Sequence, residues 1–150
     1  MTDAEVLDHV RIRAALEDYY AAVDLRDREF LIACFTEDAI ATYQCGTPDE
    51  NTTKGASVIA DSLLGIAGKM VNSTHGVSNI TIRIDGTRAQ STTFSVIQAN
   101  TGEKIIERGL RYDDEMVRQG NVWKIAVRRH RALWQRIADS APIGLVTRPG

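Results

Sequence analysis

The chain has 150 residues, of which 43% are hydrophobic and 25% are charged. This size and composition are typical of one ordinary globular domain rather than a disordered or membrane protein. The 18 Lys and Arg against 20 Asp and Glu give a net charge of −2, which disfavours a nucleic acid as the main partner. The acidic start lacks the blocks of a secretory signal, and no apolar run reaches the roughly 20 residues of a spanning helix. We therefore expect a cytoplasmic protein without a membrane partner.

Helical patterns dominate the first part of the chain. Thr2 and Glu5 form a capping box, which predicts the start of a long helix that runs to about Asp24. Six residues recur along it at helical spacing, and they are Val6, Val10, Arg13, Leu16, Tyr20 and Val23. Asp27 is positioned to cap a second, shorter helix that ends before residues 36–38. The fold is therefore expected to open with two helices in tandem.

The middle of the chain combines a short strand, a loop and a third helix. Residues 39–43 are partly β-branched and predict a strand. The turn-rich stretch 46–55 predicts a loop that covers or flanks another part of the molecule. Residues 57–70 predict a helix that ends near Gly68.

Four long strands follow, over residues 77–84, 89–99, 104–118 and 122–134. Turn residues separate them, namely Asp85-Gly86, Asn100-Thr101-Gly102 and Gln119-Gly120-Asn121. Such an antiparallel meander behind helices predicts an α+β fold, in which N-terminal helices cover one face of a curved, cone-shaped sheet around a cavity. We expect a single domain over residues 1–138 and a C-terminal extension over residues 139–150.

Two residues stand out as candidates for chemistry. Asp24 lies four residues after Tyr20, on or beside the stripe that faces the core, where a carboxylate is costly; alternatively it is a solvated helix-end residue. His75 enters the first long strand, and alternation with Val77 and Asn79 places it opposite the isoleucine face. A β-bulge would swap these two faces, and a structural role for this histidine stays open.

Arginines on the last strand form a second group. Arg128 aligns by alternation with Ala126 and His130, while Arg129 and Arg131 face the other side. The alternative is a solvated edge of paired charges. Neither a phosphate-binding loop nor a metal-ligand spacing is present, because His9, His75 and His130 are too scattered in the sequence. We therefore expect no cofactor and no metal, and the two cysteines are expected to stay reduced.

Several short motifs occur in the order that one known family uses. They are Val23-Asp24, His75-x-x-x-Asn79, Ile84-Asp85-Gly86-Thr87-x-Ala89 and Gly120-Asn121-Val122-Trp123-Lys124-Ile125. With these motifs, residues 5–135 resemble the SnoaL-like branch of the nuclear transport factor two-like superfamily. That branch includes scytalone dehydratase, hexachlorocyclohexane dehydrochlorinase, polyketide cyclases and small subunits of ring-hydroxylating dioxygenases. The resemblance implies a cystatin-like α+β barrel.

The resemblance also implies site residues and an activity. Asp24, His75 and Arg128 match the catalytic positions of the dehydrochlorinase pattern, and Tyr20, Tyr43 and Arg108 are the expected substrate contacts. The implied activity is that of a cofactor-independent lyase, performing a dehydratase-like elimination on a small hydrophobic cyclic substrate. This lyase would act through a dyad of Asp24 and His75. The alternatives are an isomerase or cyclase with the same dyad, a ligand-binding module, or a structural subunit of the dioxygenase type. A homo-oligomer, trimer or dimer, is implied too, and a monomeric mass in light scattering would contradict it.

Overall fold

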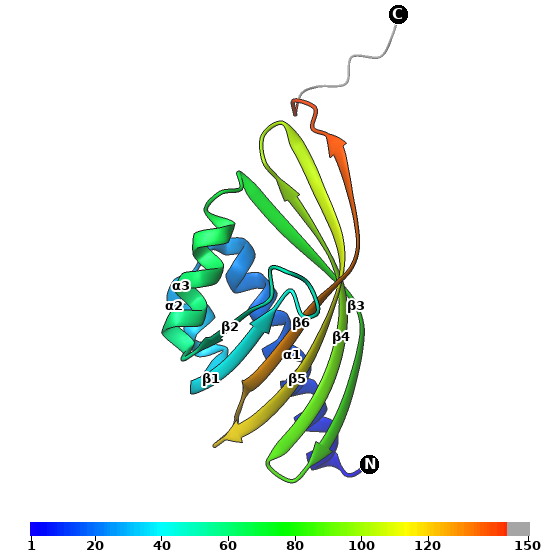
Figure 1. The fold of residues 1–150 in the computed structure, drawn as a ribbon. Helices are drawn as coiled ribbons and strands as arrows, with labels where there is room; N and C mark the ends of the chain where they lie inside the picture. The colour runs from blue at the N-terminus through cyan, green and yellow to red at the C-terminus, as the bar shows by residue number, and fades with distance from the viewer. Residues whose placement is uncertain (144–150) are drawn as a thin grey trace, which may run out of the picture.

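A computed structural model describes residues 1–143, which form three helices against one six-stranded sheet (Figure 1). The helices are α1 (Asp3–Leu25), α2 (Arg28–Ala33) and α3 (Ala56–Ala67). The strands are β1 (Phe35–Tyr43), β2 (Asn51–Lys54), β3 (Asn72–Asp85), β4 (Arg88–Asn100), β5 (Lys104–Gln119) and β6 (Val122–Asp139). The order across the sheet is β2-β1-β6-β5-β4-β3.

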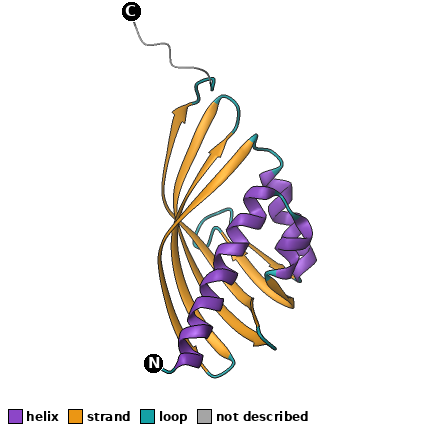
Figure 2. Ribbon diagram, turned by 180° about the vertical axis from the view of Figure 1, so that it is seen from behind, coloured by secondary structure: helices purple, strands orange, loops and turns teal. Residues whose placement is uncertain are grey.

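The predicted α+β class is confirmed, and all three helices lie on one face of the curved sheet (Figure 2). The sheet is twisted strongly enough that the strands cross in both views, and it stays open between its edge strands β2 and β3 (Figures 1 and 2). The core between the layers holds an aromatic cluster in which rings meet edge to face. Its members are Tyr19, Tyr20, Phe35 and Tyr112.

Helix α1 has the predicted length, but its buried stripe differs from the predicted one. Val6 and Val10 are 47% and 59% exposed. The inward positions in this part of the helix are Asp8 and Ile12. Because Asp8 is polar, a pattern of hydrophobic residues does not identify this position as buried. Its burial is possible because the carboxylate accepts hydrogen bonds from Trp123 Nε1 at 3.0 Å and Arg118 Nη1 at 2.9 Å.

The antiparallel meander β3 to β6 is confirmed, whereas the start of the sheet differs from expectation. β1 begins at Phe35 rather than at residue 39, with a register shift between Phe35 and Ile40. It lies parallel to β6, which makes the sheet mixed. β2 occupies residues that were expected to be loop, and it pairs with β1 through a short hairpin. Its sequence, Asn51-Thr52-Thr53-Lys54, lacks the apolar alternation that identifies a strand.

Two β-bulges correct the predicted side-chain directions. The register of β3 against β4 shifts between Val77 and Ile80, so His75 and Val77 share the inner face with the isoleucines that follow, instead of lying opposite them. A second shift, opposite the Glu115/Met116 step of β5, interrupts the alternation between Ala126 and Arg128. Arg128 therefore does not share a face with Ala126 by simple alternation, although it does share the buried face with His130.

The predicted boundary between residues 138 and 139 falls at the end of β6, whose last residue is Asp139. Of the predicted extension, residues 144–150 lie outside the described residues. None of the helices within residues 1–143 is long and apolar enough to cross a membrane.

Gly109 on β5 lies directly beneath the indole of Trp134 on β6. A Cβ atom added to Gly109 would come within 2.1 Å of Trp134 Nε1. The Gly109→Ala variant is therefore expected to lose about 1–3 kcal/mol of unfolding free energy, the usual cost of forcing extra volume into a packed contact. Urea unfolding followed by circular dichroism measures this loss.

Gly65→Ala is the matched control for that variant. Gly65 lies in α3, and no atom of the described residues 1–143 comes within 4 Å of an added Cβ, so the same change should raise helix stability by about 0.5–1 kcal/mol. Equal effects at the two glycines would contradict the proposed role of the indole contact.

Candidate active site

Asp24 and His75 form a bonded pair between the end of α1 and the start of β3. His75 Nδ1 lies 2.9 Å from Asp24 Oδ1, and the backbone N–H of His75 donates to Asp24 Oδ2 at 2.7 Å. Ser73 Oγ donates to Oδ1 at 2.8 Å. The carboxylate is thus held by three donors from one strand, which fixes both its orientation and that of the imidazole.

The end of α1 explains why Asp24 faces this strand. Arg26 closes the helix in a left-handed conformation with φ of 56°, and its guanidinium donates to the Asp24 carbonyl and to the Ala67 carbonyl at the end of α3. These bonds satisfy helix-end carbonyls and tie two helix ends together. The last turn of α1 therefore presents Asp24 to β3 in a fixed position.

The charge state of the pair follows from the environment of Asp24. Burial raises the pKa of Asp24, but the hydrogen bond and charge of His75, the Ser73 hydroxyl and the His75 backbone N–H lower it, and the net pKa is below the usual value. Asp24 is consequently ionised at neutral pH and can only accept hydrogen bonds. His75 Nδ1 must then carry the proton, which leaves Nε2 as the basic nitrogen of the ring.

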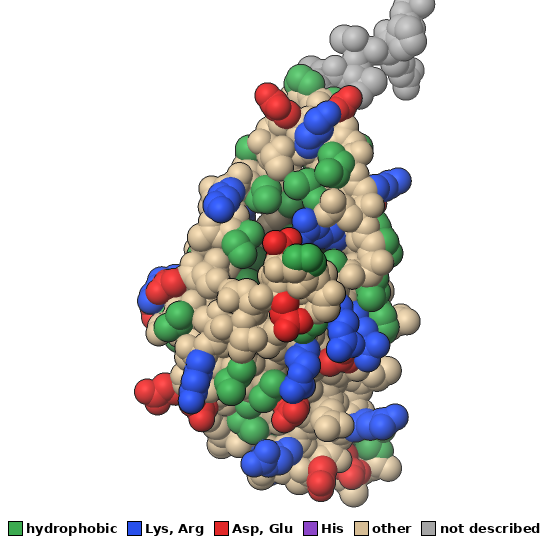
Figure 3. All heavy atoms as spheres, viewed as in Figure 1, with side chains coloured by type: hydrophobic (Ala, Val, Ile, Leu, Met, Phe, Trp, Pro, Cys, Tyr) green, Lys and Arg blue, Asp and Glu red, His purple; other side chains and the backbone are tan. Residues whose placement is uncertain are grey.

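His75 lines a cavity of about 200 Å³ between the helices and the inner face of the sheet. Figure 3 shows a hollow on this side of the molecule, with hydrophobic side chains around it and basic and acidic side chains beside it. The imidazole is 4% exposed, so a ligand that reaches it is largely removed from water. The apolar part of the lining comes from α1, α3, the turn after α3, β4 and β5, and comprises Val23, Leu63, Ile66, Ala67, Met70, Ile97, Ala99 and Leu110.

A second histidine, His130 on β6, lines the same cavity. Its Nδ1 accepts the backbone N–H of Gln44 at 3.1 Å, and its ring packs against Tyr43 and Tyr112 with centroids 5.2 and 5.1 Å away. Burial, together with the charges of Arg128 and Arg108, lowers the pKa of His130 to about 4. His130 is therefore neutral at pH 7, and its Nε2 carries a proton that it can donate to a ligand.

The lowered pKa predicts a pH dependence of stability. In the unfolded chain His130 titrates near its ordinary pKa of about 6.5, so between about pH 6.5 and pH 4 the unfolded state binds more protons than the folded state. Stability is therefore lost as pH falls through this window, by up to about 3 kcal/mol in all. Urea unfolding at pH 7, 5.5 and 4.5 should show a steeper loss for wild type than for His130→Gln. Parallel losses in the two proteins would disprove this assignment.

Arg128 lies behind the cavity wall rather than in the cavity lining. Its Nε and Nη2 donate to Asp114 at 2.8 and 2.6 Å, and both side chains are 0% exposed. The guanidinium carbon lies 3.9 Å from the ring centroid of Tyr19 and 4.7 Å from that of Tyr112, and Nη1 has no hydrogen-bond partner among residues 1–143. Arg128 is therefore a buried cation whose charge is balanced by Asp114. Tyr19 and Tyr112, which line the cavity, separate it from the cavity.

The three expected substrate contacts take different positions. Tyr43 and Arg108 line the cavity, and the Tyr43 hydroxyl pairs with that of Tyr19 at 2.9 Å. Tyr20 does not line it and packs against the His75 ring instead, with centroids 5.3 Å apart. The fold thus places His75, Tyr43 and Arg108 in the cavity lining, with Asp24 bonded to His75 and with Tyr20 and Arg128 outside the lining.

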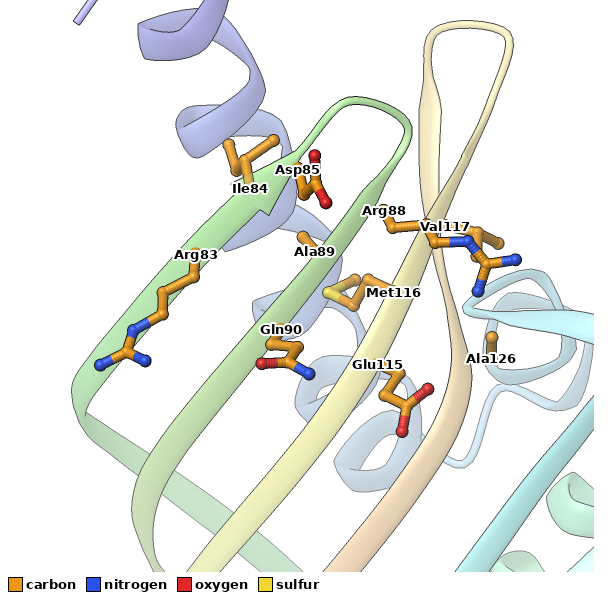
Figure 4. Close-up of a pocket in the computed structure, with 10 residues that line it drawn as sticks. All are labelled: Arg83, Ile84, Asp85, Arg88, Ala89, Gln90, Glu115, Met116, Val117 and Ala126. Atoms are coloured by element: carbon orange, nitrogen blue, oxygen red, sulfur yellow. The ribbon is translucent and has the colours of Figure 1, made fainter.

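A larger depression of about 350 Å³ lies at the other end of the sheet, on the hairpin ends of β3, β4 and β5 (Figure 4). Its lining includes charged groups of both signs, among them Arg83, Asp85, Arg88 and Glu115, and it shares no residue with the cavity of the dyad. No histidine is among the described residues that line it, so we assign the candidate active site to the smaller cavity. Within residues 1–143, no group of three or more His, Cys, Asp or Glu side chains is arranged to hold a metal ion.

Sequence reasoning missed three residues of the site. Ser73 lies two residues before His75 and therefore on the same strand face, a signal that was available. His130 was considered only as a metal ligand. Its place in the cavity lining was missed, because a strand pattern alone does not reveal which groups a side chain faces. Asp114 pairs with Arg128 across β5 and β6, and this pairing becomes visible only when the register is known.

Comparisons with known proteins agree with this fold and place the chain in a family. Residues 4–129 match the SnoaL-like domain, and the chain belongs to that family. A Mycobacterium tuberculosis protein, itself uncharacterized, is 30% identical over 138 residues, which covers 89% of this chain and 91% of the relative.

Solved structures share the fold at lower sequence identity. A protein from Novosphingobium aromaticivorans, provisionally assigned as a scytalone dehydratase, superposes with a TM-score of 0.80 at 23% identity, covering 98% of this chain and all of the other. A hexachlorocyclohexane dehydrochlorinase from Novosphingobium barchaimii gives a TM-score of 0.76 at 19% identity, covering 96% and 97% of the two chains. At these identities the likeness establishes the fold, which is nuclear transport factor two-like.

Proposed function

We propose that this protein is a cofactor-independent lyase that eliminates a leaving group, such as water, from a small, apolar, cyclic substrate. The observation that carries the proposal is the contact of 2.9 Å between His75 Nδ1 and an ionised Asp24 beside an apolar cavity. The names of two structural relatives, a dehydratase and a dehydrochlorinase, both denote eliminations. The same reaction class therefore suits the chemistry of the site and the family.

The dyad supplies the base of the elimination. Asp24 holds the Nδ1 proton, so Nε2 of His75 is free to remove a proton from a substrate carbon whose acidity is raised by a neighbouring carbonyl group. The electron pair of the broken C–H bond becomes the new double bond. The departing hydroxide takes the proton from Nε2 and leaves as water, which returns His75 to its starting state. Asp24 stabilises the imidazolium between the two steps.

Tyr20, Arg128 and Tyr43 lie around the dyad, and we propose that they hold it and the substrate in place. Tyr20 packs against the imidazole of His75 and limits its rotation. Arg128 lies over the ring of Tyr19, whose hydroxyl is bonded to that of Tyr43 in the cavity wall. We propose that Arg128 contributes to catalysis through this tyrosine pair, as a positioning residue, and that Tyr43 contacts the substrate.

An isomerase or cyclase is the second candidate, and one observation favours it. His75 is the one cavity histidine whose basic nitrogen is free, since Nδ1 of His130 is occupied by the Gln44 N–H. The imidazole that takes a proton is therefore also the group that returns it, and returning it to a different carbon would isomerise the substrate instead of dehydrating it.

Proton NMR in D2O with a set of cyclic β-hydroxy ketones distinguishes these activities. Loss of water with appearance of a vinyl proton signal supports the lyase. Deuterium incorporation next to the carbonyl without loss of water supports the isomerase. A protein that binds these ketones and produces neither change would instead be a ligand-binding module.

A further inference from the structure

Arg108 is an uncompensated cation in the cavity wall. Two other charged pairs lie around the site, Asp24 with His75 and Arg128 with Asp114. Arg108, in contrast, has no carboxylate within 4.0 Å in the part of the chain that the structure describes, and its side-chain hydrogen bond there runs from Nε to Gln135 Oε1. The two terminal nitrogens of the guanidinium are therefore left for a ligand.

His130 adds a second donor to the same side of the cavity. Arg108 lies on β5 and His130 on the neighbouring strand β6, and both line the cavity. The charge of Arg108 is one of the causes that lower the pKa of His130. Since Gln44 occupies Nδ1 of His130, its Nε2–H is the group that remains to donate. Two donors, one of them charged, therefore serve a cavity whose other walls are largely apolar.

We propose that the ligand of this cavity is an anion, a small apolar carboxylic acid whose carboxylate is bound by Arg108 and His130. The inference deepens the proposed function, since it names the chemical class of the molecule that the same cavity takes. A guanidinium binds a carboxylate through two parallel N–H···O bonds, which are stronger than bonds between neutral groups. The apolar body of the acid then lies against Leu63, Ile97 and Leu110, within the cavity that also contains His75.

One acidic residue at the cavity opposes this arrangement. Asp49 lies in the loop before β2 and lines the cavity, but its carboxylate is not within salt-bridge distance of Arg108 or of any other cation in residues 1–143. The negative charge of Asp49 would repel a bound anion only at long range, and water and salt screen such a repulsion. Asp49→Asn is therefore expected to leave the affinity for an acid unchanged or to raise it.

Isothermal titration calorimetry with 2-naphthoate and 2-naphthamide tests the proposal, because the two probes share shape and differ in charge. Wild type is expected to bind the acid about tenfold or more tightly than the amide, the usual advantage of a charge-assisted pair. Arg108→Gln should remove this preference by weakening the acid alone, and Arg108→Lys should retain part of it. Arg136→Gln is the matched control, because Arg136 pairs with Glu107 at an exposed position and does not line the cavity.

Three outcomes would overturn the proposal. They are equal affinities of wild type for the two probes, a preference for the acid that survives Arg108→Gln, and no binding of 2-naphthoate at millimolar concentration. The binding test is independent of turnover. Binding of the acid through Arg108 without any elimination would disprove the lyase and support this inference. Elimination from neutral ketones with no preference for the acid would support the lyase and disprove this inference.

Discussion

Replacing His75 with glutamine is expected to lower the elimination rate by about 10²–10⁴-fold, the contribution that a positioned general base makes. Glutamine has no basic nitrogen, so the substrate C–H bond would have to break without an acceptor for its proton. The fold should persist, because the amide retains a polar group next to Asp24 and Ser73. Initial rates from the NMR assay, read with the unfolding midpoint of each variant, measure the two effects separately.

Two further variants sharpen that experiment. Asp24→Asn should lower the same rate, because an amide can donate to Nδ1 and so favour the tautomer in which Nε2 carries the proton. His9→Gln is the control, since His9 lies on α1 and does not line the cavity. Turnover retained by the His75 variant would disprove the dyad mechanism, whatever its substrate.

The largest effect on stability is expected from Asp114→Asn. Burial lowers the pKa of Arg128, but the charge of Asp114 and its hydrogen bonds raise it, and the net pKa is well above the usual value. Without the carboxylate, a fully buried guanidinium would keep its charge and lose its counterion. Removing one partner of such a pair costs about 3–5 kcal/mol, a large fraction of the 5–15 kcal/mol or so that stabilises a typical domain. Urea unfolding at neutral pH measures the loss.

The neighbouring residue Asp113 provides the control. Its side chain is 26% exposed and pairs with Arg111 and Arg131, so Asp113→Asn should cost no more than about 1 kcal/mol. The double variant Asp114→Leu with Arg128→Met should be more stable than Asp114→Asn, because it removes the unpaired charge along with its partner. A double variant less stable than the single one would show that packing, and not charge, dominates at this position.

Local sequence signals predicted the helices and the hairpins of β3 to β6. The Thr2/Glu5 capping box forms as expected, with Glu5 N donating to Thr2 Oγ1 and Thr2 N donating to the Glu5 carboxylate. The Asp85-Gly86 turn joins β3 to β4 with Gly86 at φ of 60°. Strand β2 and the parallel pairing of β1 with β6 were not predictable, because both depend on partners that no local pattern specifies.

The site was predicted in part, and the reasons for the differences are physical. The resemblance to a family indicated Asp24 and His75, which the fold brings into contact, although the face of β3 that carries His75 was assigned incorrectly. A two-residue period reverses at a bulge, and residues 77–80 show no sign of the bulge in their composition. Whether Arg128 faces a cavity or a carboxylate depends on the register of β5 against β6. The roles of these residues in catalysis stay predictions.

The parallel contact of β1 with β6 also affects how the chain reaches its folded state. Phe35 pairs with Ile125, so β1, which can pair early with β2, joins the rest of the sheet only after the chain has been synthesised as far as β6. Closing so long a loop lowers the conformational entropy of the chain before the new contacts stabilise it, and topologies rich in such contacts fold slowly. During synthesis, Asp24 and His75 are able to meet once β3 has emerged, whereas His130 arrives last. We therefore expect the Asp24–His75 contact to be able to form before the β6 side of the cavity wall is in place.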